Sequence, residues 1–276
     1  MVKQKKLIPE NGPYYVVGYG EKRDHLCLML HGLGGDCYEL SPLAKHLHQQ
    51  GYSVLGVRYP GHGGSAKHLP HTTWQQWASH TLEAYQQVAD AHTKVSLVGF
   101  STGGTLAVYL SQHMPVHRLI LLAPFFGFRH FKSSRLSPKT WLGIARLWVK
   151  YIPAGPLPIA CPVGKKQTTP FRQYRWFSVP IIHSALELIE VIQPLLSKID
   201  VPVLAVFSPK DAVVCSRAME SSLLQMTNTT AQRHKLSGGN HIVCRDVSSD
   251  AVNTAVLDFL TNTPHLSSAQ VSVLSI

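Results

Sequence analysis

Acidic residues are missing from the middle of the chain. No Asp or Glu occurs between Asp90 and Glu187, although the 276-residue sequence contains 15 of them. The same interval holds twelve of the 26 Lys and Arg residues, so the formal net charge of +11 is concentrated there. A basic segment can bind nucleic acid, but no nucleic-acid-binding motif accompanies this one. We therefore expect no nucleic-acid partner.

Cysteine is scarce, and its spacing is irregular. The sequence has five cysteines, an odd number, and no C-x-x-C motif occurs among them. This pattern argues against a disulfide framework and against a cysteine-based zinc site. We therefore expect free thiols at Cys27, Cys37, Cys161, Cys215 and Cys244.

Long hydrophobic runs are absent as well. No apolar run approaches the roughly 18 residues that predict a membrane-spanning helix. The first ten residues are basic, but Pro9 and Glu10 stand where the apolar region of a signal peptide would lie. We therefore expect no signal peptide and a cytoplasmic location.

The chain is long enough for one sizeable α/β domain with an insertion, and its hydrophobic content of 45% provides for a core. Short apolar runs alternate with segments of helical period. This alternation predicts a mostly parallel central sheet with helices on both faces. Strands are expected over residues 14–18, 25–30, 53–58, 94–98, 117–124, 201–207 and 233–236. Helices are expected over 41–50, 73–92, 102–110, 139–152, 178–193 and 249–260.

The alternation breaks between residues 125 and 199. Prolines, aromatics and almost all of the excess positive charge fall in this segment. We interpret it as an inserted cap between two parts of one core, residues 1–124 and 200–276. The last residues of the chain show no pattern that predicts a role.

Aromatic and basic side chains share the helix predicted in the cap. Trp141 and Trp148 fall on one face, whereas Lys139, Arg146 and Lys150 fall on another. Amphipathic helices of this composition lie at membrane interfaces, so peripheral contact with an anionic membrane is one interpretation. The alternative is that the tryptophans cover a substrate pocket and the cations are solvated.

The most informative motif is Gly99-x-Ser101-x-Gly103, which stands between an apolar strand and a helix. In this spacing a serine occupies the apex of a tight, strained turn, and its hydroxyl projects above the sheet. The neighbours two residues away must be small for the turn to close. The next amide, that of Thr102, opens the helix, where it can stabilise an oxyanion.

Other polar residues follow the ends of other expected strands. His31-Gly-Leu-Gly-Gly35 follows one strand, Asp211 follows another, and His241 follows a third. The carboxyl ends of parallel strands meet at one edge of a sheet, so we expect Asp211 and His241 to lie near Ser101. The amide of Leu33 is the natural second donor to an oxyanion.

These residue types support nucleophilic catalysis. Ser101 is a weak nucleophile unless a base such as His241 removes its proton, and Asp211 would orient and stabilise the imidazole. Glu220 is a less favoured acid because it falls in an expected helix. His62 is interpreted as a polar loop residue and not as the base.

Four motifs are similar to those of the α/β-hydrolase superfamily: His31-Gly-Leu-Gly-Gly, Gly99-Phe-Ser-Thr-Gly-Gly, Pro209-Lys-Asp-Ala-Val-Val and Gly239-Asn-His. The loop Tyr59-Pro-Gly-His-Gly-Gly-Ser and the position of the cap resemble the bacterial carboxylesterase and monoacylglycerol lipase group. The resemblance covers residues 25–124 and 200–260. It implies a Ser101, Asp211 and His241 triad, an oxyanion hole of the Leu33 and Thr102 amides, and neither metal nor organic cofactor.

The motifs therefore predict a serine hydrolase that cleaves small carboxylic esters of apolar acyl chains through an acyl-enzyme. A thioesterase or a C–C hydrolase would use the same triad, so the sequence leaves these alternatives open. A ligand-binding or membrane-associated protein with little turnover is a further alternative, against which the complete triad argues.

Overall fold

The computed structural model describes residues 8–64, 68–69, 71–129, 140, 143, 148–171 and 174–262. Within these residues a seven-stranded sheet has the order β1-β3-β2-β5-β6-β9-β10. Strand β1 is antiparallel to β3, and the other neighbours are parallel, so the prediction of a mostly parallel sheet is confirmed. The strands are β1 (Tyr14–Val16), β2 (His25–Leu30), β3 (Ser53–Val57), β5 (Lys94–Phe100), β6 (Arg118–Leu122), β9 (Val203–Phe207) and β10 (Ala231–Lys235).

The central strands are buried on both faces. Every residue of β2 is buried, and Leu28 in this strand pairs with Leu55 on one side and Leu97 on the other. A parallel strand that is covered on both faces has no solvent side, so its sequence is a continuous apolar run. For this reason the apolar runs of the sequence mark the central strands closely.

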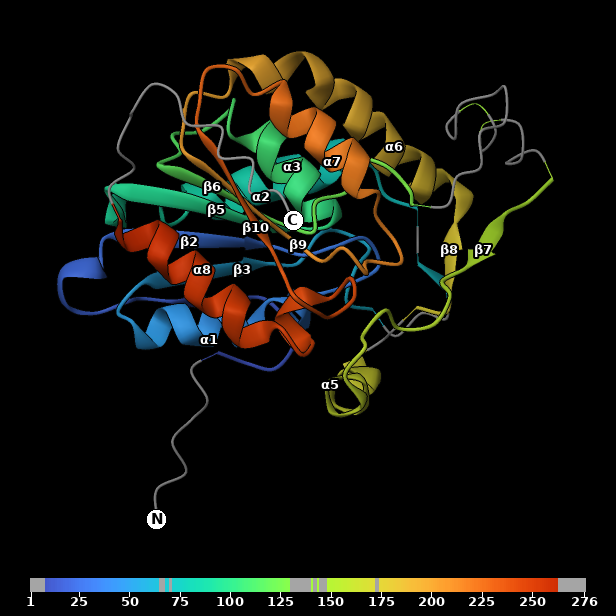
Figure 1. Ribbon diagram of the computed structural model, residues 1–276, viewed down its shortest axis with the longest axis horizontal. Coiled ribbons are helices and arrows are strands. Elements are labelled where there is room, and N and C mark those ends of the chain that lie inside the picture. The colour runs from blue at the N-terminus through green and yellow to red at the C-terminus, as the bar shows by residue number, and fades with distance from the viewer. Residues whose placement is uncertain are drawn as a thin grey trace.

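Helices cover both faces of the sheet, as predicted (Figure 1). On one face, α1 (Ser41–Gln49) packs against α8 (Ser249–Thr261). On the other face, α2 (Trp74–Gln86) contacts α3 (Thr102–Leu110), and α6 (Val179–Ile192) packs on both of them. Two further helices are α5 (Pro162–Thr168) and α7 (Ser216–Leu224).

A second, three-stranded sheet is built largely from the segment between β6 and β9 (Figure 1). Its middle strand, β8 (Trp176–Ser178), pairs antiparallel with β7 (Tyr151–Pro153) and parallel with β4 (His68–Leu69). Because β4 belongs to the loop after β3, this sheet joins segments that are far apart in the sequence. The sequence predicts none of these strands, since two or three residues are too few to show a period.

The helix predicted over residues 139–152 falls largely outside the described residues. Thr140 and Gly143 are helical, but Tyr151 and Ile152 pair with β8 in strand β7. The prediction is therefore wrong at its C-terminal end, where strand pairing replaces the helix. Outside the described residues lie Lys139, Trp141 and Arg146.

Helix α6 and the 3₁₀ turn after it form the most apolar helical segment of the described residues. This segment, Val179–Lys198, is long and apolar enough to cross a membrane by length and composition alone. Half of its most apolar window is buried inside the protein, and α6 packs on α3 and α2. A core helix meets the same criterion, and the packing accounts for the apolar character of α6.

Leu28→Ala tests whether β2 is the centre of the core. Leu28 is completely buried, so the substitution should lower the free energy of unfolding by about 2–5 kcal/mol. The matched control is Leu224→Ala, because Leu224 is 69% exposed and its truncation should change this free energy by about 0.5 kcal/mol or less. Urea unfolding measures both, and equal losses would contradict the placement of β2.

Candidate active site

Ser101 stands at the junction of β5 and α3 in a strained backbone conformation. Its φ of 52° and ψ of −121° lie where non-glycine residues are uncommon. The turn is tight because the helix comes very close to the sheet. A Cβ atom on Gly103 would overlap the carbonyl oxygen of Leu30, and one on Gly99 would overlap that of Gly103. The motif therefore needs both glycines, as the sequence predicts.

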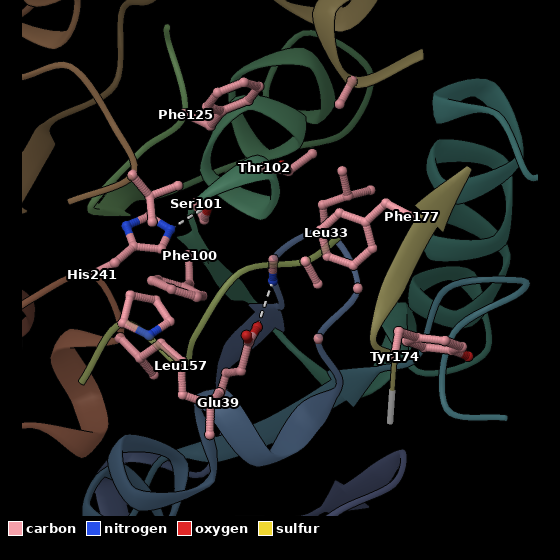
Figure 2. A pocket seen from close by; sticks show the side chains of 18 of the residues that line it. Leu33, Glu39, Phe100, Ser101, Thr102, Phe125, Leu157, Tyr174, Phe177 and His241 are labelled. Carbon is pink, nitrogen blue, oxygen red and sulfur yellow. Dashed lines mark hydrogen bonds between the residues drawn. The ribbon is translucent and has the colours of Figure 1, made fainter. Parts of the chain in front are cut away.

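Ser101, His241 and Asp211 form a hydrogen-bonded chain. His241 Nε2 lies 2.9 Å from Ser101 Oγ (Figure 2), and His241 Nδ1 lies 2.7 Å from Asp211 Oδ2. All three side chains are buried. With the imidazole proton on Nδ1, the ring donates to Asp211 and Nε2 is free to accept from the serine hydroxyl. The structure thus brings together the three residues that the sequence singled out.

Asp211 is held in its charged form. Burial raises the pKa of its carboxyl, but the His241 hydrogen bond and charge, with the amides of Val214 and Val213, outweigh this effect. The net result is a pKa below the ordinary value. Asp211 Oδ1 accepts the amides of Val213 at 2.7 Å and Val214 at 3.0 Å, which leaves Oδ2 for His241.

Two residues whose roles were not predicted from the sequence fix the loop of His241. Asn240 Oδ1 accepts the amides of Ala212 and His241, so it ties the loop to that of Asp211. Asp246 accepts the amide of Asn240 at 2.7 Å and those of Ala160 and Cys161 at 2.8 and 2.7 Å. Burial raises the pKa of Asp246, but these amides outweigh it and lower the pKa overall. Asp246 therefore joins the His241 loop to the segment between β6 and β9.

Leu33 and Thr102 line the cavity beside Ser101 (Figure 2). Thr102 is the first residue of α3, and neither amide donates to an acceptor in the described part of the chain. The loop of Leu33 is supported by His31, whose Nδ1 donates to the Gly32 oxygen at 2.8 Å. Burial lowers the pKa of His31 to about 4, so this imidazole is neutral at pH 7. The amides of Leu33 and Thr102, the predicted oxyanion donors, are thus available to donate hydrogen bonds to a ligand.

The cavity above Ser101 has a volume of about 190 Å³ and a largely apolar wall. Part of the wall comes from the core, including Leu33, Phe100 and Ile242. The rest comes from the segment between β6 and β9, including Pro156, Leu157, Tyr174, Phe177 and Ile182. The arrangement can hold an apolar group against a serine, an imidazole and two free amides.

The alternative candidates for the base and the acid, His62 and Glu220, do not take part in this hydrogen-bonded chain. His62 is buried among the rings of His31, Tyr59 and Trp77, and burial lowers its pKa to about 3. Its role is therefore packing of the loop, as interpreted from the sequence. Glu220 is exposed on α7. Among the described residues, no group of three or more His, Cys, Asp or Glu side chains could hold a metal ion.

The chain is similar in sequence to known hydrolases over most of its length. The family model described as serine aminopeptidase, S33, matches residues 21–248. A carboxylesterase of Bacillus subtilis is 21% identical over 86% of this chain and 92% of its own. A thermostable monoacylglycerol lipase of Bacillus sp. (strain H-257) is 32% identical over 38% of this chain and 38% of its own.

Solved structures share the fold. A structure of the metagenome-derived lipolytic enzymes LipS and LipT has a TM-score of 0.76 at 20% identity and covers 92% of this chain and 99% of its own. A monoacylglycerol lipase of Paleococcus ferrophilus has a TM-score of 0.73 at 17% identity, over 90% of this chain and 98% of its own. The predicted hydrolase architecture is confirmed.

Proposed function

Because the chain belongs to the serine aminopeptidase S33 family of α/β hydrolases, we propose that it is a serine hydrolase that cleaves carboxylic esters through an acyl-enzyme. Carboxylesterase and monoacylglycerol lipase relatives support the ester hydrolase class. The observation that carries the proposal is the hydrogen-bonded chain from Asp211 through His241 to Ser101.

In the proposed mechanism, Ser101 Oγ attacks the ester carbonyl carbon while His241 Nε2 takes its proton. The carbonyl oxygen becomes an oxyanion, which the amides of Leu33 and Thr102 stabilise. The alcohol leaves with the proton of His241 when the C–O bond breaks, and the acyl group stays on Ser101. Water then attacks the acyl-enzyme with His241 as base, and the acid is released. Asp211 holds the imidazole tautomer and stabilises the imidazolium.

The proposed substrate is a small ester with an apolar acyl chain, and a monoacylglycerol is one candidate. The support is the wall of the cavity, where phenylalanine, leucine and isoleucine side chains surround the serine. Apolar surface removed from water contributes about 25 cal/mol per Å², so an alkyl chain gains from this site. A panel of esters, thioesters and acylglycerols of different chain lengths would separate this substrate class from the alternatives.

We also propose residues 125–199 as a cap over residues 1–124 and 200–276. In support, Leu157, Tyr174 and Phe177 of this segment line the cavity above Ser101. The segment is anchored to the core, because β8 pairs with β4 and α6 packs on α3. A cytoplasmic location stays a prediction.

Ser101→Ala removes the proposed nucleophile. Ester hydrolysis should fall by several orders of magnitude, since triad members act as a unit and little beyond binding and the oxyanion hole remains. A fluorophosphonate probe should label the wild-type protein and leave Ser101→Ala unlabelled. The melting temperature serves as the control for folding. Wild-type turnover in the purified, folded variant would refute the proposal.

Asp211→Asn tests the proposed acid. The amide favours the wrong tautomer of His241, and kcat should fall by up to about 10⁴-fold. Glu220→Gln is the matched control, because Glu220 is an exposed carboxylate on α7 and its change should leave kcat as in the wild type. A near-wild-type rate for Asp211→Asn, with a loss for Glu220→Gln, would move the role of acid to Glu220.

Peripheral contact with an anionic membrane remains a second proposal. Trp148 is 86% exposed beside Lys150, and Tyr151 and Trp176 are 43% and 37% exposed on one face of the small sheet. The opposite face of this sheet carries Phe177, which lines the cavity. A membrane on the outer face would bring lipid close to the proposed substrate site. Aromatic residues and cations together favour the interfacial region of bilayers.

Charge reversal tests this contact. Lys150 and Arg175 are exposed and directly precede Tyr151 and Trp176 in the sequence. Lys150→Glu with Arg175→Glu should release the protein from anionic vesicles, because each basic residue near such a surface contributes about 1 kcal/mol. The matched control reverses Arg233 and Lys235, two exposed cations on β10. Co-sedimentation at low and high salt is the measurement, with hydrolysis of a small soluble ester followed in parallel. No binding of the wild type at low salt, or equal losses in both variants, would contradict the proposal.

A further inference from the structure

A buried carboxyl group lies against the loop that carries the Leu33 amide. Glu39 stands at the end of the 3₁₀ turn Cys37–Glu39 and is only 6% exposed. Its Oε2 accepts the amide hydrogen of Gly32 at 2.8 Å, the bond drawn below the loop in Figure 2. Gly32 directly precedes Leu33, so the carboxyl group is one residue away from a proposed oxyanion donor.

The shape of the loop follows this carboxyl group. A Cβ atom on Gly35 would overlap both carboxyl oxygens of Glu39. A Cβ atom on Gly32 would lie 3.3 Å from Glu39 Oε2 and 3.2 Å from Ser101 Cβ. The carboxyl group therefore contacts the loop at both ends and is close to Ser101. Glu39 also lines the cavity, where the proposed mechanism gives it no part.

We propose that Glu39 is a positioning residue, which holds residues 32–35 so that the Leu33 amide points at the oxyanion, and that it does so as an uncharged carboxylic acid. The inference rests on the proposed function, because it assigns Leu33 a role in stabilising the oxyanion. It adds a residue and a charge requirement that the triad does not contain.

The surroundings of Glu39 favour the neutral form. Burial raises its pKa to about 8, although the Gly32 hydrogen bond and the Arg245 charge oppose the rise and Asp36 adds to it. Asp36 is itself paired with Arg58 at 2.6 Å. The other titratable groups near Glu39 are Tyr59 and Cys244, which are neutral at pH 7 because burial raises the pKa of each, and His241, which lines the same cavity.

The charge of Glu39 matters because the proposed oxyanion develops beside the loop that the Glu39 carboxyl group contacts. A carboxylate at Glu39 would repel that negative charge in a site with little water. Hydrolysis of an uncharged ester should therefore fall as the pH rises through about 8, the pKa to which burial raises Glu39. Ionisation would also change the Gly32 contact that sets the loop.

Two substitutions separate geometry from charge. Glu39→Ala leaves the Gly32 amide without its acceptor and should lower kcat about 10- to 100-fold, with little change in KM, because loss of one oxyanion donor costs about 10²- to 10³-fold. Glu39→Gln keeps an acceptor oxygen and cannot ionise. It should restore much of the kcat lost in Glu39→Ala and abolish the alkaline fall. A pH-stat assay with a neutral, soluble short-chain alkyl ester measures both, and Glu220→Gln is the matched control with the wild-type pH profile.

A third variant tests the contact itself. Gly35→Ala should displace the Glu39 carboxyl group and lower kcat, and the double variant Gly35→Ala/Glu39→Ala should be no worse than Glu39→Ala alone. Additive losses would mean that the two residues act separately and would overturn the proposed contact.

Stability gives a readout that needs no catalysis. The folded protein keeps the Glu39 proton up to about pH 8, whereas the unfolded chain releases it near pH 4.5. The wild type should therefore lose stability as the pH rises between these values. Glu39→Gln has no such proton, so its stability relative to the wild type should rise from pH 4 to pH 9 in urea unfolding.

The outcomes are distinct. An alkaline fall that persists in Glu39→Gln, or a folded Glu39→Ala with wild-type kcat, would overturn the role of Glu39 and leave the triad intact. Wild-type turnover by Ser101→Ala would instead overturn the proposed function. A wild-type profile that stays flat above pH 8 would refute the uncharged form.

Discussion

The close approach of α3 to the sheet is the constraint on which the site depends. With no side chain at Gly99 or Gly103, the helix begins directly against the ends of β5 and β2, and the chain passes through Ser101 at positive φ. This geometry places the hydroxyl group and the Thr102 amide on the same side of the sheet. The neighbouring parallel strands end at the same edge of the sheet. Short loops after these strands are therefore enough to bring Leu33, Asp211 and His241 close to Ser101.

Three carboxyl groups near the site show how hydrogen-bond donors decide charge. His241 and two backbone amides hold the pKa of Asp211 below its ordinary value despite burial, and several backbone amides do the same for Asp246. Glu39 accepts a hydrogen bond from the Gly32 amide, but burial has the larger effect and raises its pKa. Burial, hydrogen-bond donors and neighbouring charges together set the charge of each carboxyl group. Asp211 can therefore hold a negative charge behind His241, while burial favours the neutral form of the Glu39 carboxyl group in the cavity wall.

Much of this arrangement could be predicted from the sequence, because parallel topology is a strong constraint. Once apolar runs identify the strands, their carboxyl ends meet at one edge, and the G-x-S-x-G motif together with the positions after the strands singles out Ser101, Asp211 and His241. Glu39 and Asp246 could not be found this way. Their burial depends on contacts between loops distant in the sequence, and a lone acidic residue beside a turn has the pattern of a solvated surface residue. Strands β4, β7 and β8 could not be predicted either. They form because segments far apart in the sequence pair with one another, and such pairing leaves no local periodicity in the sequence.

The pairing of β4 with β8 makes the proposed cap depend on residues 68–69, which belong to the loop after β3. Residues 68–69 complete a sheet whose other two strands lie between β6 and β9, and Asp246 accepts the amides of Ala160 and Cys161 from the same segment. An exchange of residues 125–199 with the corresponding segment of a relative would therefore remove the partner strand of β4 and the amides of Ala160 and Cys161 that Asp246 accepts. The unit that can be transplanted is a discontinuous one, made of the cap, the loop after β3 and the turn at Asp246.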